Sequence, residues 1–536
     1  MTNQHPQEIE LKLTLPPGAV DAFLRRMARR RAAPSVQTLV TLYFDTPDFA
    51  LSAAGVALRV RRVGRRWLQT LKTEGERAGG LSRRIEYEMP VRGGALDWTR
   101  FPPEALAHVP DSARAQVVPV FETRFHRTAW LLKGRGGAQI EVALDVGEVV
   151  AGERSQPLCE IELELKSGQP DALFALALDW AGAFGCLPFD VSKAERGVRL
   201  AHGVAAAPMK SAPASLSHGQ NVEDGFAAIV QACLAQFQAN LPGVLESLPL
   251  TGEGASAEPT PGPHPNPLPG GEGANAGPTP VNEYVHQARV ALRRLRAALR
   301  LFRGACVLPD ELTAGLRALA AALGPARDWD VLVGETLPAI APHCPDADAW
   351  QRGLAAIEAR RGEVRAAMRV ALDAAQPGVW LLGMQRWLQR RGWRADAAPA
   401  LRLAQLAPLD DWARRALKRG HRRVARDARA FDTLPPAARH ALRIAIKRQR
   451  YAVEFFQPLF AGKRQVRYLA VLRDAQDSLG CANDARVAWG LLASLGTAAG
   501  PMGDFARGWL AAKQADADDA ESARLMQGFL DTPPCW

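Results

Sequence analysis

The 536-residue sequence lacks several features that would assign it to a class of protein directly. It contains no run of about 18 uncharged apolar residues, so we expect no membrane-spanning helix and no membrane partner. Its first residues are polar and lead into a strand pattern without an apolar stretch, so we expect no secretory signal. The motifs G-x-x-x-x-G-K-S/T and H-E-x-x-H are absent, which argues against a P-loop nucleotide site and a zinc-protease site.

Cysteine is scarce and scattered. The seven cysteines stand at 159, 186, 233, 306, 344, 481 and 535, without a C-x-x-C pair. An odd number of widely spaced thiols is typical of reduced cysteines rather than of a disulfide framework or a zinc site. We therefore expect a cytoplasmic protein.

The overall composition is that of a globular protein with an excess of positive charge. Hydrophobic residues make up 47% and charged residues 23% of the chain, and the formal net charge is +11. The length exceeds one usual hydrophobic core, so two or three domains are expected. The positive charge favours an anionic partner, and on this ground alone nucleic acid, a membrane surface and polyphosphate all remain open.

The first 200 residues alternate apolar and polar side chains in the manner of strands. Because the polar faces bear many charges, we predict a closed antiparallel barrel of eight strands with a polar interior. The strands are expected at 8–15, 36–45, 56–63, 66–73, 82–90, 117–132, 138–149 and 157–166. Helices are expected at 17–31, 99–108 and 170–185.

Two of these strands concentrate carboxylates on one face. Residues 8–13 read E-I-E-L-K-L and residues 160–165 read E-I-E-L-E-L. Alternation places Glu8, Glu10 and Lys12 together, and likewise Glu160 and Glu162. An edge strand with solvated charges would explain either segment alone. Two such strands brought together would crowd carboxylates, which a divalent cation such as Mg²⁺ or Mn²⁺ relieves.

Basic side chains alternate in the same way on neighbouring strands. Arg59 and Arg61 share a face, Lys72 ends the next strand, and Arg84 alternates with Glu86 on the strand after that. Arginine forks match phosphate oxygens, and a metal ion neutralises the remaining charge. An interior with carboxylates on one side and cations on the other therefore predicts a site for a metal-bound polyphosphate.

From about residue 215 the pattern becomes helical and contains an internal repeat. His286 is followed by Arg289, Arg293 and Arg296, and His440 is followed by Arg443, Lys447 and Arg450 at the same spacing. On a helix these positions form one basic stripe. A third helix, 409–429, adds Arg415, Lys418, Arg422 and Arg426 in the same kind of register. A solvated basic face explains one such stripe, whereas its recurrence favours a bound polyanion.

The composition and the repeat define the expected domain boundaries. A Pro- and Gly-rich stretch without lysine, arginine or periodicity interrupts the first copy of the repeat and is predicted to be a disordered insertion. We expect a barrel domain at 1–205, a linker at 206–219, a first helix at 220–248, the insertion at 249–281, the remaining helices at 282–500 and a helical tail at 501–536. The breaks between helices are expected after 323 and near 478–482, at the Leu-Gly pairs of the two copies.

The motifs of the first part resemble the CYTH family, the triphosphate tunnel metalloenzymes. The resemblance lies in E-x-E-x-K at the start, R-x-R at 59–61, Q-T-L-K at 69–72, R-I-E-Y-E at 84–88, E-I-E-L-E at 160–164 and S-K-A-E-R at 192–196. It implies that Glu8, Glu10, Glu160 and Glu162 bind one or two divalent ions and, with Lys12, form the catalytic set. It further implies a substrate-binding set of Lys12, Arg59, Arg61, Lys72, Arg84, Glu86, Arg127, Asp145 and Lys193, with Glu86 and Asp145 lining the tunnel. Alternation puts Arg124 and Arg127 on opposite faces, and R-T-A-W at 127–130 matches the family better, so Arg127 is chosen.

The second part resembles the CHAD domain, a duplicated helical module associated with polyphosphate binding. The run V-H-Q-A-R-V-A-L-R-R-L-R at 285–296 is its strongest signature. The resemblance implies polyphosphate binding by His286, Arg289, Arg293, Arg296, His440, Arg443, Lys447 and Arg450. Nucleic acid is not expected as a partner. The sequence contains no recognition-helix motif, and it has no pattern of aromatic residues interleaved with the cations.

These observations predict a multidomain α+β protein: an eight-stranded antiparallel tunnel barrel followed by an all-α duplicated helical bundle. The predicted function is a metal-dependent inorganic triphosphatase that cuts tripolyphosphate to pyrophosphate and phosphate and binds long-chain polyphosphate through its helical domain. Two alternatives stay open. The same tunnel suits an adenylate cyclase or a thiamine triphosphatase, and the protein could instead be a non-catalytic polyphosphate-binding scaffold.

Overall fold

The computed structural model describes residues 7–30, 32–246, 248, 280–395, 397–515 and 519–536. The chain forms two compact units, of which the first contains Met1–Ala207 and Gln376–Arg390 and the second contains Pro208–Ala375 and Arg391–Trp536. The predicted insertion at 249–281 lies outside the described residues except for its last two positions. Within the described part of the chain, no helix has the length and apolar character needed to cross a membrane.

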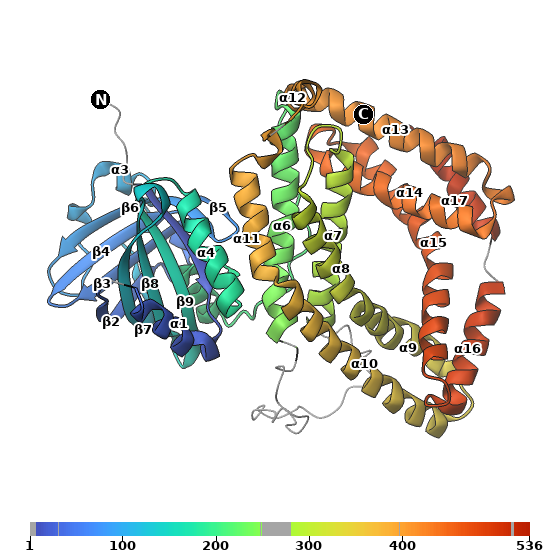
Figure 1. Cartoon of the computed structure of the whole chain (residues 1–536), viewed down its shortest axis with the longest axis horizontal. Coiled ribbons are helices and arrows are strands. Elements are labelled where there is room, and N and C mark those ends of the chain that lie inside the picture. The colour runs from blue at the N-terminus through green and yellow to red at the C-terminus, as the bar shows by residue number, and fades with distance from the viewer. Residues whose placement is uncertain (1–6, 31, 247, 249–279, 396, 516–518) are drawn as a thin grey trace. The chain divides into compact units, whose positions relative to one another are not determined.

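The first unit is built around a closed antiparallel barrel (Figure 1). The order β1-β9-β8-β7-β2-β3-β4-β6 is completed by pairing of β6 with β1, which confirms the predicted eight-stranded barrel. Its strands are β1 (Gln7–Thr14), β2 (Ser35–Asp45), β3 (Val56–Val63), β4 (Arg66–Thr73), β6 (Leu81–Val91), β7 (Val118–Lys133), β8 (Gln139–Ala151) and β9 (Arg154–Ser167). Two short strands, β5 (Glu76–Ala78) and β10 (Leu187–Pro188), were not predicted, because so few residues show no periodicity.

Helices cover the apolar outer face of the barrel. Leu11 and Leu13 alternate with the charged residues of β1 and are fully buried. They share an apolar core with Phe23 of α1 (Val20–Ala28) and Trp180 of α4 (Asp171–Phe184), and Figure 1 shows both helices against the strands. Burying each leucine stabilises the fold by about 1.5–3 kcal/mol. This packing directs the charged residues of the same strand into the barrel.

Besides α1 and α4, the described part of the barrel unit contains two more helices and the single turns α2 (Ala50–Ala53) and α3 (Pro103–Leu106). The helix α5 (Lys193–His202) packs on β7, β8 and β9. Ser192 and Glu195 form a capping box at its start, which fixes the position of Lys193 as its first residue. The helix α11 (Pro377–Gln389) comes from the range predicted for the helical domain, yet it belongs to the first unit.

The second unit is all-helical, as predicted. Its helices are α6 (Val222–Glu246), α7 (Pro280–Leu301), α8 (Asp310–Val331), α9 (Leu337–Ile340), α10 (Ala347–Ala375), α12 (Pro399–Leu406), α13 (Leu409–Arg429), α14 (Pro436–Phe455), α15 (Lys463–Ser494), α16 (Gly500–Ala515) and α17 (Asp519–Asp531). The two repeat helices α7 and α14 pack on each other, and each packs on the helix that follows it, α8 or α15 (Figure 1).

The Leu-Gly pairs do not end helices, so the breaks predicted there are wrong. Helix α8 runs through Gly324 and α15 runs through Gly480. A Cβ at Gly324 would lie 3.1 Å from Arg289 Nη1, and that guanidinium donates to the carbonyl of Leu323 at 3.2 Å. A glycine inside a helix costs about 1 kcal/mol relative to alanine. Here the glycine provides the space that an arginine of the basic stripe occupies.

Candidate functional site

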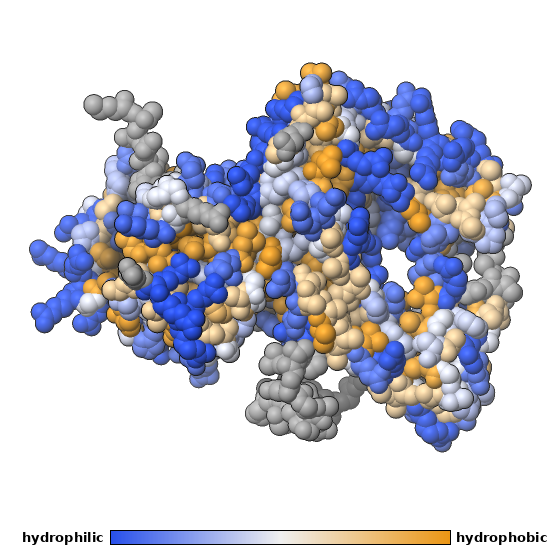
Figure 2. Space-filling view, viewed as in Figure 1, coloured by the Kyte–Doolittle hydropathy of each residue, from blue (hydrophilic) through white to orange (hydrophobic). Residues whose placement is uncertain are grey.

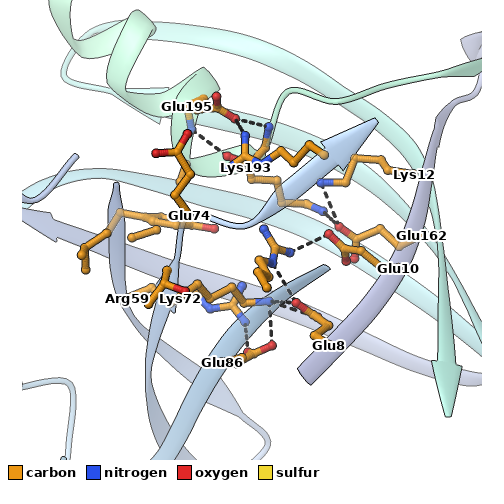
Figure 3. A pocket seen from close by; sticks show the side chains of 18 of the residues that line it. Glu8, Glu10, Lys12, Arg59, Lys72, Glu74, Glu86, Glu162, Lys193 and Glu195 are labelled. Atoms are coloured by element: carbon orange, nitrogen blue, oxygen red, sulfur yellow. Dashed lines mark hydrogen bonds and ion pairs between the residues drawn. The ribbon is translucent and has the colours of Figure 1, made fainter. Parts of the chain in front are cut away.

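The interior of the barrel contains a cavity of about 620 Å³ lined mainly by charged side chains. Figure 3 shows Glu8, Glu10, Lys12 and Glu162 pointing into it from strands β1 and β9. In the antiparallel register Lys12 stands opposite Glu162, so alternation on two neighbouring strands brings these groups to the same surface. The charged faces predicted from the sequence therefore do form the interior of the barrel.

One group of charges surrounds Glu8. Its carboxylate accepts from Lys72 Nζ at 2.9 Å and from Arg84 Nε at 2.8 Å. Burial raises the pKa of Glu8, but the charges of Lys72 and Arg84 outweigh it and hold this pKa below its usual value. Glu86 contacts Lys72 at 2.9 Å and Arg59 at 3.3 Å, and its pKa is about 2 because these charges outweigh the effect of burial.

Arg84 joins this group to Glu10. Its Nη2 donates to Glu10 at 2.6 Å, and Ser82 Oγ donates to the same oxygen at 3.3 Å. Burial lowers the pKa of Arg84, but the charges of Glu10 and Glu8 raise it above its usual value. The guanidinium therefore stays charged and compensates both carboxylates.

A second group of charges surrounds Lys193. Its Nζ contacts Asp145 at 2.7 Å and Glu162 at 2.8 Å, and it also pairs with Glu160. One oxygen from each of these three carboxylates lies within 4.8 Å of the others, a grouping suited to a metal ion. Lys12 adds a second ammonium, 3.7 Å from Glu160 and 3.4 Å from Glu162. Two lysines thus neutralise the crowded carboxylates in this structure.

Arg127 completes the second group. It binds Asp145 through two hydrogen bonds of 2.7 and 2.6 Å and donates to Glu162 at 2.5 Å. Arg124 instead has its side chain 55% exposed and pairs with Glu122. The alternation in β7 therefore places Arg127 inside the barrel and Arg124 outside.

The cavity does not reach every residue predicted for it. Asp145 and Glu160 are 0% and 1% exposed, and they lie behind Lys193 and Arg127 rather than along the cavity surface. Asp145, which was predicted to line the tunnel, lies beneath the cations that it binds and is absent from the cavity surface. The predicted residues that do line the cavity are Glu8, Glu10, Lys12, Arg59, Arg61, Lys72, Arg84, Glu86, Arg127, Glu162 and Lys193.

Arg61 differs from the other cations of the cavity. Its Nε donates to Thr41 Oγ1 at 3.0 Å, and no carboxylate lies within ion-pair distance among the described residues. Burial and the charges of Arg59 and Arg127 lower the pKa of Arg61 to about 10. An incoming anion would relieve this repulsion, so the end of the cavity around Arg61 favours phosphate.

Tyr43 lines the same part of the cavity and was missed by sequence reasoning. It pairs with Arg59 across β2 and β3 and stacks on Phe121 with ring centroids 4.6 Å apart. Burial raises the pKa of Tyr43, but the charges of Arg59, Arg61 and Lys193 lower it overall. Its position opposite the R-x-R motif was the signal available in the sequence.

The donor set of the cavity fits a hard divalent cation. Oxygen ligands from carboxylates suit Mg²⁺ or Mn²⁺ better than the softer metals. Glu160 Oε2 is buried and has no hydrogen-bond partner among the described residues, although Arg196 Nη1 lies 3.7 Å away, so this oxygen can still accept a bond from a ligand. Of the predicted ligands, Glu160 and Glu162 already lie together, whereas Glu8 and Glu10 are paired with Arg84.

The second unit contains a separate cluster of cations between α7 and α14. Burial lowers the pKa of Lys447 to about 7, together with the charges of Arg293, Arg443, Arg450 and Arg289. Arg289 and Arg443 have distant acidic neighbours, Asp328 at 3.6 Å and Asp484 at 3.9 Å. The two predicted stripes therefore face each other, and their charges are only partly compensated.

The remaining predicted residues of this unit contribute less charge to the cluster. Burial lowers the pKa of His286 to about 4, with the charge of Arg327 adding to the effect, so His286 is neutral at pH 7. Arg296 and His440 are exposed. Arg327, in α8, was not predicted. Its position next to Asp328, the acidic residue that follows the Leu323-Gly324 pair, was the signal available in the sequence.

Comparisons with known proteins agree with both resemblances. The CYTH domain model matches residues 6–198, and the CHAD domain model matches residues 273–493. The inorganic triphosphatase of Haemophilus influenzae is 34% identical over 208 residues, which are 37% of this chain and 56% of that protein. The chain thus matches little more than half the length of this relative.

Two solved structures show weaker similarity. The CHAD domain from the plant Ricinus communis is 28% identical with a TM-score of 0.49, covering 62% of this chain and all of that one. HpAC1 from Hippeastrum, named as an adenylyl cyclase and described as having a dominant triphosphatase activity, is 19% identical with a TM-score of 0.27. That match covers 37% of this chain and 97% of the other. The two domain matches give the assignment: this chain joins a CYTH domain, the domain of the metal-dependent triphosphate tunnel enzymes, to a CHAD domain.

Proposed function

We propose that the barrel is a metal-dependent inorganic triphosphatase that hydrolyses tripolyphosphate to pyrophosphate and phosphate. The observation that supports this most directly is the composition of the cavity, where buried carboxylates of β1 and β9 face Arg59, Arg61 and Arg127. The 34% identity to an inorganic triphosphatase over part of its length also supports the proposal.

The roles of the side chains follow from their charges. Arg61, Arg59 and Lys72 would bind phosphate oxygens, and Arg127 would be held in its orientation by its two hydrogen bonds to Asp145. Glu8, Glu10, Glu160 and Glu162 would hold Mg²⁺ or Mn²⁺, which supplies Lewis-acid stabilisation of the phosphoryl oxygens when bound. Lys12 and Lys193 would move from carboxylates toward phosphate. Phosphoryl transfer depends mainly on such positioning and charge stabilisation.

The cavity surface favours an inorganic substrate over a nucleotide or thiamine triphosphate. Apart from Tyr43, its lining consists of charged, small polar and aliphatic side chains. Tyr43 is only 4% exposed and stacks on Phe121, so its ring is not available to a base or a thiazole. Aromatic faces are the usual platform for planar ring systems.

The first prediction concerns substrate and metal. With Mg²⁺ or Mn²⁺, we expect kcat/KM for tripolyphosphate to exceed the values for ATP and thiamine triphosphate by at least about 100-fold, or about 3 kcal/mol of transition-state stabilisation. Removal of metal with EDTA should reduce the rate to background. Phosphate release measured on the three substrates provides the test, and a preference for an organic triphosphate would contradict the proposal.

For the helical unit we propose long-chain polyphosphate as the ligand. Its support is the cluster of Arg289, Arg293, Arg443, Lys447 and Arg450, in which a half-buried lysine is surrounded by arginines. A linear polyanion would replace mutual repulsion with ion pairs along both helices. A scaffold without catalysis would need only this cluster, and it remains the alternative function.

The second prediction concerns the pH dependence of this binding. Lys447 in the free protein has a pKa of about 7, and a bound polyanion favours its charged form and raises this pKa. Binding above pH 7 therefore takes up a proton, and we expect affinity to fall between pH 7 and 9 by up to about tenfold per unit. The neighbouring arginines stay charged throughout. Fluorescence titration should show this slope in the wild type, and Lys447→Arg should show little pH dependence.

A further inference from the structure

We propose that helix α11 is a brace of the barrel, and that Gln385 on it is a positioning residue for Lys12 and Lys193. The helix lies within the range matched by the CHAD model, yet it folds as part of the first unit. Nothing in the tunnel motifs points to residues so distant in the sequence. The catalytic consequence of this inference rests on the proposed triphosphatase function, whereas its structural part does not.

The apolar side of α11 completes the core that covers the barrel. Leu382 is fully buried in the same core as Leu173 and Trp180 of α4, and Val379 packs against that core. At the start of α4, Asp171 accepts two hydrogen bonds of 2.7 Å from Arg386. A bidentate arginine–carboxylate pair fixes the rotation of the helix as well as its position.

Both ends of α11 have an unusual backbone conformation. Gln376 before the helix and Arg391 after it have φ angles of 46° and 48°. Only one other non-glycine residue of the described chain, Phe49, has a positive φ. Left-handed geometry costs a non-glycine residue about 1–2 kcal/mol, so it persists only where packing enforces it. The chain is therefore bent sharply into and out of this helix.

The helix packs closely against two segments of the barrel unit, and a glycine lies at each contact. A Cβ on Gly378 would lie 2.0 Å from the carbonyl oxygen of Cys186, immediately before β10. A Cβ on Gly79, in the turn between β5 and β6, would lie 2.0 Å from Cγ of Gln385. Gln385 is 0% exposed, and both its amide atoms lack a hydrogen-bond partner among the described residues. A buried unpaired amide costs about 1–3 kcal/mol, so the amide group itself does not stabilise the fold.

These two segments hold the backbone of Lys12. The amide of Lys12 donates to the carbonyl of Gly80 at 2.8 Å, and its own carbonyl accepts from Phe189 at 3.0 Å. The amide of Gly80 donates to Asp190 at 2.6 Å. Asp190 stands two residues before Ser192, the capping residue of the helix that begins at Lys193. The contact between Gln385 and Gly79 is therefore connected through hydrogen bonds of Gly80 to the backbone of Lys12. Through Asp190 it is also connected to the segment from which the helix of Lys193 begins.

The expected consequence is a loss of alignment when the contact is removed. Lys12 and Lys193 hold three carboxylates through ion pairs, and misplacement of catalytic groups by about 1 Å can cost up to about 100-fold in rate. Truncation of Gln385 removes an unpaired amide and leaves a small cavity, so a purely structural role predicts a changed melting temperature with unchanged activity. A positioning role predicts lower activity at the same stability.

The experiment uses the full chain with Gln385→Ala and Gln385→Met. Methionine keeps the length of the side chain against Gly79 without the amide. We expect Gln385→Ala to lower kcat/KM for tripolyphosphate about tenfold with an unchanged melting temperature. Gln385→Met should stay within about twofold of the wild type. Arg390→Ala, at the residue that follows the helix, is the control: its side chain is 62% exposed and reaches Asp171 only at 3.7 Å, so we expect kcat/KM within about twofold of the wild type.

Hydrogen exchange separates this inference from the proposed activity. In Gln385→Ala, the amides of Lys12 and Phe189 should exchange at least about tenfold faster, while those of β7 keep their rates. If the wild type proves inactive, the triphosphatase proposal fails and exchange alone decides the inference. If Gln385→Ala does not fold, Arg386→Lys replaces it, because this variant loses the bidentate pair with Asp171. In Arg386→Lys we expect kcat/KM to fall, and the exchange of the same amides to rise, by about threefold. Unchanged exchange rates in Gln385→Ala would overturn the inference. So would a loss of kcat/KM in Gln385→Met equal to that in Gln385→Ala.

Discussion

Glu162→Gln should lower kcat for tripolyphosphate by about 10²–10³-fold, equivalent to roughly 3–4 kcal/mol. The carboxylate of Glu162 contacts Lys193 and Arg127 and lies 3.4 Å from Lys12. Burial raises the pKa of Glu162, but these cations hold it well below its usual value, so the residue is charged at every working pH. The substitution therefore removes a permanent charge at the centre of the site, together with a proposed metal ligand.

Glu164→Gln is the matched control for this variant. Glu164 lies two residues further along the same face of β9, also lines the cavity, and pairs with Lys166 at 2.7 Å in a half-exposed position. The chemical change is identical, and we expect kcat within about threefold of the wild type. Glu10→Gln provides an independent second variant, with a loss similar to that of Glu162→Gln. Melting temperatures distinguish lost catalysis from lost folding.

Two outcomes of this series would favour other functions. If the wild type, Glu10→Gln and Glu162→Gln all show the same negligible turnover while polyphosphate still binds, the protein is a scaffold with an inactive tunnel. If Glu162→Gln retains full activity with bound metal, Glu162 is not part of the catalytic set.

Replacing Arg289, Arg293, Lys447 and Arg450 by alanine should weaken binding of long-chain polyphosphate at least 100-fold at low salt. Hydrogen bonds to charged groups contribute about 1.5–3 kcal/mol each, so the loss of four such residues makes about 100-fold a lower bound. The dependence of affinity on salt concentration should also flatten, because fewer counterions are released on binding. Affinity measured by titration at several salt concentrations provides both quantities.

The control for this variant is a set of four exposed cations on α13. Arg415, Lys418, Arg422 and Arg426 lie on one face of this helix and are exposed, and Figure 2 shows hydrophilic side chains along it. Their replacement by alanine removes the same number of basic residues, yet we expect at most about a tenfold loss, because solvated charges contribute little to one specific site. Equal losses in the two variants would mean that polyphosphate responds to net charge rather than to the cluster between α7 and α14.

Local patterns in the sequence were sufficient to predict much of the tunnel. Strands have a period of two, so E-I-E-L-K-L and E-I-E-L-E-L divide their residues between two faces wherever they fold. The apolar faces of these strands pack against α1 and α4. The charged faces therefore line the interior of the barrel. The same alternation put Arg124 and Arg127 on opposite faces, and the resemblance of R-T-A-W to the CYTH family then selected Arg127 for the interior.

Patterns failed where the outcome depended on partners distant in the sequence. The break predicted at Leu323-Gly324 ignored Arg289, which fills the space beside the glycine. Asp145 was expected at the cavity surface, but two cations from β7 and α5 cover it. The strands β5 and β10 form because neighbouring segments pair with them, and two or three residues show no periodicity by themselves.

The sequence by itself determined which side chains share a face, because the geometry of strands and helices is local. It therefore determined the barrel, the helical region and the charged groups available to each site. Only the tertiary structure decided that Lys193 neutralises Asp145, Glu160 and Glu162, and that α11 joins the barrel. These arrangements result from packing and electrostatic compensation between segments up to hundreds of residues apart, which no local period encodes.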